Sequence, residues 1–130
     1  MSFFEVLKGA LGVGESPSAL PSRESPLFLY VKIPGHIEPL DRAERFEDPL
    51  QEALDAAGLG EITGGGSQLG EAGPDGTRII EFCGIDVDLF ALEPGLALLR
   101  RELTRLRAPV GTVLIYKFGE KKYEQPVHEA

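Results

Sequence analysis

The run from Leu27 to Ile33 (LFLYVKI) is rich in aliphatic and aromatic residues and ends at Pro34-Gly35, which predicts the first strand of a sheet. Side chains alternate across a strand, so this strand has two distinct faces. One face carries Leu27, Leu29, Val31 and Ile33, and the other carries Phe28, Tyr30 and Lys32. Both faces are largely apolar, and we therefore expect this strand in the middle of the sheet.

Two later segments have the hydrophobic period of amphipathic helices. The first is predicted to begin at Asp48-Pro49, an N-cap carboxylate before proline, and to end at Gly58, which suits a left-handed C-terminal cap. The second opens at Pro94-Gly95 and ends at Ala108. Its apolar stripe comprises Leu96, Leu99, Leu103 and Leu106, with Arg100, Arg101, Arg105 and Arg107 off the stripe.

Between these helices, residues Leu59 to Leu89 predict a Gly-rich hairpin. Its first strand, Leu59 to Thr63, is short, and the chain returns as Arg78 to Leu89. The apolar parity of the return strand switches at Cys83-Gly84, which predicts a β-bulge there. Such a bulge would keep five apolar residues on one side, Ile80, Phe82, Ile85, Val87 and Leu89, and leave Glu81, Asp86 and Asp88 on the other.

A final strand, Thr112 to Phe118, completes the order β-α-β-β-α-β. This order predicts an α+β fold of the ferredoxin-like kind, a sandwich in which two helices cover one face of a four-stranded antiparallel sheet. We assign residues 27–118 to this domain, residues 1–26 to an N-terminal helical arm and linker, and residues 119–130 to a polar C-terminal tail. Within the arm, residues 3–11 predict a short helix.

Composition and charge narrow the class of protein. The 130 residues, 42% hydrophobic and 26% charged, are typical of one soluble globular domain. The single cysteine, Cys83, cannot form an internal disulfide, and the residues before Gly14 have only Lys8 as a positive charge, unlike a secretory signal. No apolar run could span a membrane. We therefore expect a cytoplasmic protein, and the formal net charge of −8 argues against a nucleic-acid partner.

The face of the sheet that the helices leave uncovered is the predicted functional surface. It would carry Phe28, Tyr30 and Lys32 from the first strand and Glu81, Asp86 and Asp88 from the third. The last strand would add the residues of one of its two faces, either Leu114, Tyr116 and Phe118 or Val113, Ile115 and Lys117. Exposed aromatic patches are normally covered by association, which predicts a homo-oligomer. The candidate interface residues are Phe3, Phe4, Leu7, Phe28, Tyr30 and Tyr116. Alternatively, the N-terminal arm covers this face within one chain.

The Gly-rich run is the second candidate site. Backbone N–H groups of Gly64, Gly65, Gly66, Ser67 and Gln68 could approach a small anionic ligand, although the Lys-Ser/Thr of a phosphate loop does not follow. A strand that bulges explains the same glycines. Cys83 has no His or Asn beside it, and His36 and His128 lie far apart. We therefore expect no catalytic residue, no metal and no cofactor.

The run Gly60 to Gln68, with the later segment Ala108 to Thr112, looks like small uncharacterised bacterial proteins of ferredoxin-like topology over about residues 27–118. The order of elements and the long loop after the second strand also resemble the PII-like signal-transduction proteins. That second resemblance implies oligomers with nucleotide sites in clefts between subunits, here near Gly64 to Gln68. The sequence thus predicts a non-enzymatic oligomeric recognition or regulatory domain that binds a protein or a small ligand. The alternative is a PII-like sensor of an anionic metabolite or nucleotide.

Overall fold

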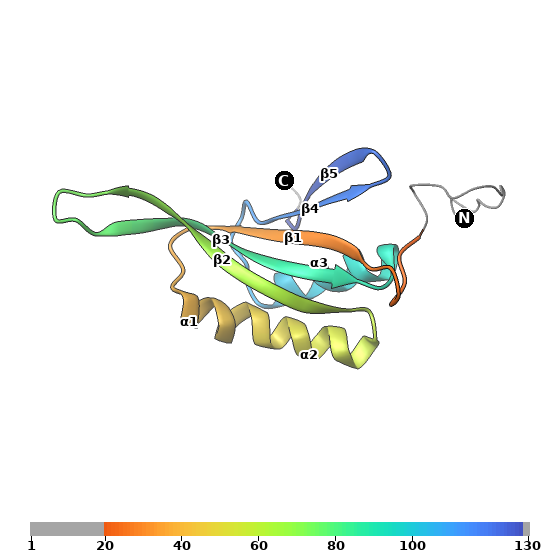
Figure 1. Ribbon diagram of the computed structural model, residues 1–130. Coiled ribbons are helices and arrows are strands. Elements are labelled where there is room, and N and C mark those ends of the chain that lie inside the picture. The colour runs from red at the N-terminus through yellow and green to blue at the C-terminus, as the bar shows by residue number, and fades with distance from the viewer. Residues whose placement is uncertain (1–19, 129–130) are drawn as a thin grey trace.

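The protein has an α+β fold in which five strands form one antiparallel sheet (Figure 1). The computed structural model describes residues 20–128, so the predicted arm helix of residues 3–11 lies outside the described range. The strands lie in the order β2-β3-β1-β4-β5, and every neighbouring pair is antiparallel. Their bounds are Leu27–Pro34 for β1, Gly60–Ala72 for β2, Arg78–Leu89 for β3, Val113–Phe118 for β4 and Lys121–Pro126 for β5.

Two helical segments connect these strands. The first is continuous and comprises α1 (Pro39–Arg42), a π-helical turn (Ala43–Glu47) and α2 (Asp48–Ala57), and the second is α3 (Leu92–Arg105). The predicted helix corresponds to α2, but Asp48 is not an N-cap, because it already has helical dihedral angles (φ −63°, ψ −50°) and continues the turns before it. The helix begins after Glu38, with Pro39 in its first turn. The predicted end is confirmed, since Gly58 adopts a left-handed conformation (φ 67°).

The hydrophobic core lies between both helical segments and one face of the sheet. Fully buried side chains come from β1, β3 and β4, chiefly Leu29, Val31, Ile33, Ile85, Val87, Leu89 and Leu114, and from the helices, chiefly Phe46, Leu50, Leu54, Leu99 and Leu103. Each large apolar side chain buried in this way contributes about 1.5–3 kcal/mol. A register slip of one residue would turn the strand residues to the other face, so the core fixes the register of the sheet.

The expectation of a four-stranded sheet was wrong, because part of the predicted polar tail forms the edge strand β5. A turn at Gly119 (φ 68°) lets β5 pair with β4 along its whole length. Tyr123 of β5 stacks on Tyr116 of β4, with ring centroids 5.2 Å apart. The Gln125 side-chain amide donates a hydrogen bond of 2.9 Å to the Tyr116 hydroxyl, and Arg100 of α3 donates to Gln125. These contacts hold the tail as a strand although it contains few apolar residues.

The predicted bulge at Cys83-Gly84 is not present. β1 pairs with β3 in unbroken register from Leu27↔Leu89 to Pro34↔Phe82. The irregularities lie instead in the pairing of β2 with β3, and one of them leaves Glu81 between the paired residues Ile80 and Phe82. Cys83 is therefore on the core face, and Phe82 turns to the opposite face. The apolar parity changes along β3 because its outer part leaves the core and extends with β2 as a protruding hairpin (Figure 1).

Candidate functional site

The candidate site is the face of the sheet that lies opposite the helices, which we call the open face. It is built around Phe28, Tyr30 and Lys32 of β1, whose neighbours on β3 are Asp88, Asp86 and Gly84. Across Tyr30, one row of paired residues runs from β2 to β5 as Gly64, Asp86, Tyr30, Ile115 and Glu124. The strand alternation predicted from the sequence therefore places Phe28, Tyr30, Lys32, Asp86 and Asp88 on this face, and the structure confirms that placement.

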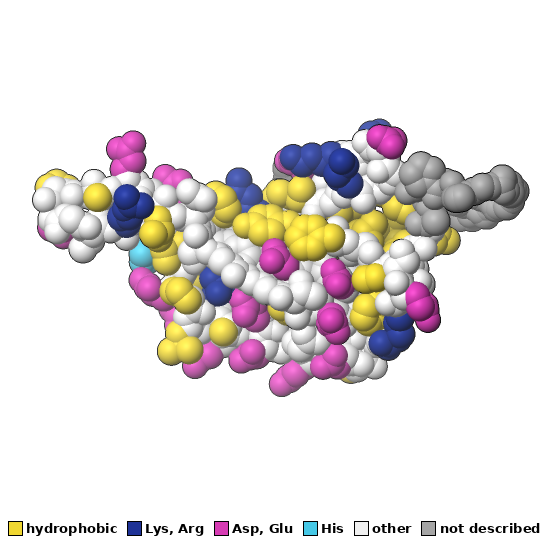
Figure 2. All heavy atoms as spheres, viewed as in Figure 1, with side chains coloured by type: hydrophobic (Ala, Val, Ile, Leu, Met, Phe, Trp, Pro, Cys, Tyr) yellow, Lys and Arg dark blue, Asp and Glu magenta, His cyan; other side chains and the backbone are white. Residues whose placement is uncertain are grey.

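An apolar strip crosses the middle of the open face. Phe28 is 54% exposed, which is unusual for a large aromatic side chain, and Tyr30 and Ile115 lie beside it partly buried. Figure 2 shows hydrophobic side chains gathered over this part of the sheet, with acidic side chains next to them. Next to Phe28 is a hollow of about 550 Å³, bounded by residues 21–26, β1 and the β4–β5 hairpin. Its rim includes Lys117 and Lys122.

Tyr30 lies flat against the sheet because its neighbour Gly84 has no side chain. A Cβ at Gly84 would overlap the ring and hydroxyl of Tyr30, so only glycine allows this contact. Burial raises the pKa of the Tyr30 phenol, and the Asp86 carboxylate raises it further. The raised pKa favours the neutral form of the phenol.

Tyr116 lies on the other face of the sheet. It is paired with the core residue Leu29 and is only 6% exposed. The sequence left open which parity of the last strand faces outward, and the candidate interface residues included Tyr116. The outward set is in fact Val113, Ile115 and Lys117, because Leu114 and Tyr116 point toward α3 and the core. Tyr116 therefore supports the fifth strand from inside and does not contribute to the open face.

Charges divide the open face into two halves. The half formed by β2 and β3 carries the carboxylates of Glu61, Asp86 and Asp88. The half formed by β4 and β5 carries the ammonium groups of Lys117 and Lys122, and Lys122 also lies 3.1 Å from Glu124. Sequence reasoning missed Lys122 because it assigned this residue to the tail. The apolar strip on β1 separates the two halves.

The Gly-rich run, by contrast, does not form a loop. Gly64 to Gln68 lie inside β2 and pair with Asp86 to Phe82 of β3. On the core side of the sheet, Gly65 admits the partly buried ion pair of Arg42 and Glu47, whose Nε and Oε2 atoms are 2.6 Å apart. Arg42 also donates to the Ser67 hydroxyl at 3.1 Å. Thus Arg42 is the cation next to this run, and Glu47 neutralises it.

The remaining candidates for chemistry, Cys83, His36 and His128, each have other contacts. Cys83 is fully buried, and burial raises the pKa of its thiol, so it is a poor nucleophile. His36 accepts a hydrogen bond from the Ile80 backbone N–H and contacts Glu38, whereas His128 contacts the Ala108 carbonyl. Among residues 20–128, no group of three or more His, Cys, Asp and Glu side chains could hold a metal ion.

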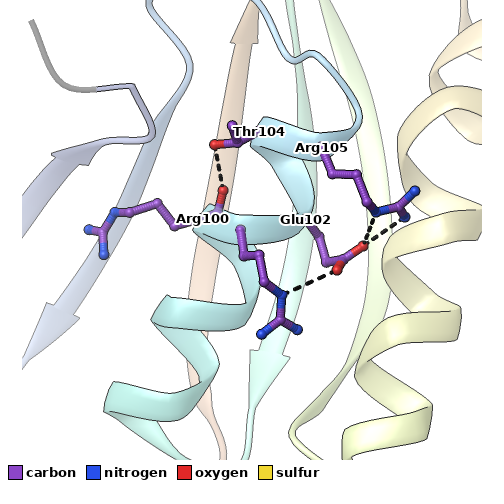
Figure 3. Close-up of polar contacts among 5 residues, drawn as sticks. Arg100, Glu102, Thr104 and Arg105 are labelled. Carbon is purple, nitrogen blue, oxygen red and sulfur yellow. Dashed lines mark hydrogen bonds and ion pairs between the residues drawn. The ribbon is translucent and has the colours of Figure 1, made fainter.

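The basic side of α3 is partly neutralised from within. Glu102 accepts hydrogen bonds from Arg105 at 2.7 and 2.9 Å and from Arg101 at 3.4 Å, as the close-up in Figure 3 shows. The hydrogen bonds from Arg105 hold the pKa of the Glu102 carboxyl below its usual range, although burial opposes this shift. Thr104 bonds to the Arg100 carbonyl in the preceding turn. This helix therefore offers less free positive charge than its three arginines, Arg100, Arg101 and Arg105, suggest, and Arg107 lies beyond its end.

Two further findings bear on the class of protein. In the part of the chain that the structure describes, no helix is long and apolar enough to cross a membrane. No family model, no curated protein and no solved structure matches the chain. The predicted interface residues Phe3, Phe4 and Leu7 lie outside the described residues. The fold and the site thus define an α+β protein with a charge-divided sheet face that residues 20–128 leave largely uncovered.

Proposed function

We propose that this protein is a non-enzymatic oligomeric domain of ferredoxin-like topology that acts in recognition or regulation through its open face. The observation that carries the proposal is the apolar strip, in which Phe28 is 54% exposed beside the partly buried Tyr30 and Ile115. The first four strands in the order β2-β3-β1-β4, with the helices on one side, support the ferredoxin-like assignment. We expect such a face to be covered by association, because apolar surface of this kind is costly to hydrate.

Replacing Phe28 with Asp tests this proposal. The carboxylate would have to be desolvated at the centre of the interface, so we expect the dissociation constant for self-association to rise at least about tenfold. Sedimentation velocity over a range of protein concentrations measures this change. Val110→Asp is a matched control, because Val110 is 85% exposed and lies in the loop before β4, away from the strip. We expect this control to associate like the unmodified chain.

A chain that stays monomeric at all concentrations would contradict the oligomer proposal. In that case a thermal-shift panel of nucleotides and small anionic metabolites separates the remaining possibilities. A ligand present at 100 times its dissociation constant stabilises the folded state by about 2.7 kcal/mol, which a melting curve detects. A shift that Arg42→Ala abolishes would favour the sensor function near Gly64 to Gln68.

A further inference from the structure

One row of side chains crosses the open face at the level of Phe28. Glu61 of β2 pairs with Asp88 of β3, and Asp88 pairs with Phe28. Lys117 follows Tyr116, the partner of Leu29, and so lies level with Phe28, while Lys122 of β5 pairs with Lys117. From one edge of the sheet to the other, the row therefore presents two carboxylates, a phenyl ring and two ammonium groups, of which the Lys122 ammonium also contacts the exposed Glu124 carboxylate at 3.1 Å.

When two copies of such a face pack together with two-fold symmetry, the axis lies in the plane of the interface, and its two limiting directions are perpendicular and parallel to the strands. An axis perpendicular to the strands places each half of the face on the same half of the other copy. Carboxylates then meet carboxylates, which is unfavourable. An axis parallel to β1 places the β2–β3 half of each copy on the β4–β5 half of the other. Opposite charges then meet on both sides of the phenyl rings.

We infer that the open face binds a second copy of this chain, with the two-fold axis parallel to β1 and the carboxylates of Glu61 and Asp88 against Lys117 and Lys122 of the other copy. This inference rests on the proposed function, in which the open face mediates self-association, and adds the orientation of the second copy and the charged groups that meet. The two sheets pack face to face about 10 Å apart, and the inclination of about 30° that is usual for aligned sheets corresponds to an axis about 15° from β1, which is nearly parallel to it. The interface is isologous, so each charged contact occurs twice.

The shape of the face fits the same arrangement. Phe28 projects from β1, and the hollow of about 550 Å³ begins beside it on the β4–β5 side. Rotation about an axis parallel to β1 carries the Phe28 of each copy toward the hollow of the other. Rotation about the perpendicular axis instead places the hollow of one copy against the hollow of the other, so neither hollow is filled. The projecting ring and the adjacent hollow therefore favour the orientation that the charges favour.

Charge reversal within one chain tests this orientation. We expect Glu61→Lys with Asp88→Lys to weaken self-association at least about tenfold, because lysines then face lysines across the interface. Lys117→Glu with Lys122→Glu should weaken it similarly. Combining all four substitutions exchanges the two halves, so self-association should return to within about threefold of the unmodified chain. Sedimentation velocity gives the dissociation constants, and circular dichroism checks the fold of each variant.

The outcomes separate the inference from the proposed function. If the unmodified chain associates but reversal of one half has no effect, the two charged halves do not face each other and the inference is overturned. The same holds if the variant with all four substitutions stays as weak as the variants with two. If no variant and no unmodified chain associates, the proposed function itself fails. Cross-linking of residues 3–11 to the open face within a monomer would likewise contradict the proposed function.

Discussion

Gly84 and Gly66 face each other across β2 and β3, yet their surroundings differ. The ring of Tyr30 covers Gly84, while a Cβ at Gly66 would meet nothing within 4 Å. Glycine is therefore required at the first position by a close contact, but not at the second. The open face depends on this difference, because Tyr30 could not lie against the sheet over a larger residue.

We predict that Gly84→Ala destabilises the protein by about 1–3 kcal/mol, since the new methyl group must displace the Tyr30 ring or the strand. Gly66→Ala should change stability by less than about 0.5 kcal/mol, because space is open and alanine reduces the entropy of the unfolded chain. Urea unfolding measures both values. In the Tyr30→Ala background, Gly84→Ala should lower the free energy of unfolding by less than it does in the unmodified chain. If the two substitutions have strictly additive effects on this free energy, the contact between the Tyr30 ring and Gly84 is contradicted.

The pH dependence of stability should reveal the ion pairs of Glu102. Its pKa is lower in the folded protein than in the unfolded chain, so it stabilises the fold at neutral pH. This contribution is lost as the pH falls below the ordinary glutamate range and through the lowered pKa. We expect it to be below about 1 kcal/mol, because both arginines are more than half exposed. Relative to the unmodified chain, Glu102→Gln should lose less stability between about pH 7 and pH 3 in urea unfolding.

At the scale of elements, the protruding β2–β3 hairpin is attached to the body through a side chain. His36 follows β1, and its Nδ1 accepts a hydrogen bond of 2.9 Å from the Ile80 backbone N–H of β3. On the opposite ring nitrogen, His36 contacts Glu38 at 2.8 Å. Beyond this point the residues of the hairpin are exposed except for the partly buried Gly70, and they include Leu69 and Ile79. His36 therefore marks the boundary between the supported and the free part of the hairpin.

We predict that His36→Ala loosens this boundary without unfolding the domain. The Ile80 N–H would lose its acceptor, so its hydrogen exchange should accelerate about five- to tenfold, as expected from the net free energy of one hydrogen bond. Exchange mass spectrometry or NMR measures the change. Glu38→Ala leaves Nδ1 in place and should have little effect. Equal acceleration in the two variants would show that the Ile80 contact does not hold the hairpin.

A helix or strand can be predicted from the sequence when its own residues have a clear hydrophobic pattern. β1, β3 and α3 have strong apolar patterns, and their positions were predicted. β5 has only Tyr123 as a large apolar residue, and it forms because β4 offers a free edge and Tyr116 a stacking partner. Likewise, the first helical segment extends back to Pro39 because Phe46 adds a buried turn before Leu50. Such tertiary contacts cannot be read from local spacing.

The residues of the candidate site were likewise predictable only where the local pattern of the strand was unambiguous. Alternation along β1 and β3 identified the open-face positions Phe28, Tyr30, Asp86 and Asp88. On β4 both parities are apolar, so only the packing of Leu114 and Tyr116 against the helices decides the outward set. The basic half of the face was not predicted because Lys122 depends on the unforeseen β5. Likewise, Arg42 reaches Ser67 over 25 positions of sequence, which no motif could indicate.

At the scale of the whole molecule, local and overall charge make opposite predictions about association. The formal net charge of −8 makes two copies repel each other at long range. Reversing Glu61 and Asp88 lowers this repulsion, because each substitution makes the chain two charges more positive. If overall charge governed association, that variant would associate more tightly than the unmodified chain. The arrangement in which the β2–β3 half of each copy faces the β4–β5 half of the other predicts weaker association of this variant. The dissociation constant of this one variant therefore discriminates between contacts of opposite charges in the interface and the overall charge of the chain.

The glycines of β2 also have a consequence for solubility during synthesis and storage. β2 is a thirteen-residue strand at one edge of the sheet, and long edge strands are templates for fibrous aggregates. Gln51 accepts a hydrogen bond from the Ile62 N–H at this edge, and Gly64 to Gly66 next to it have low strand propensity and no side chains to interlock. The run that first suggested a binding loop thus makes the edge a poor seed for amyloid.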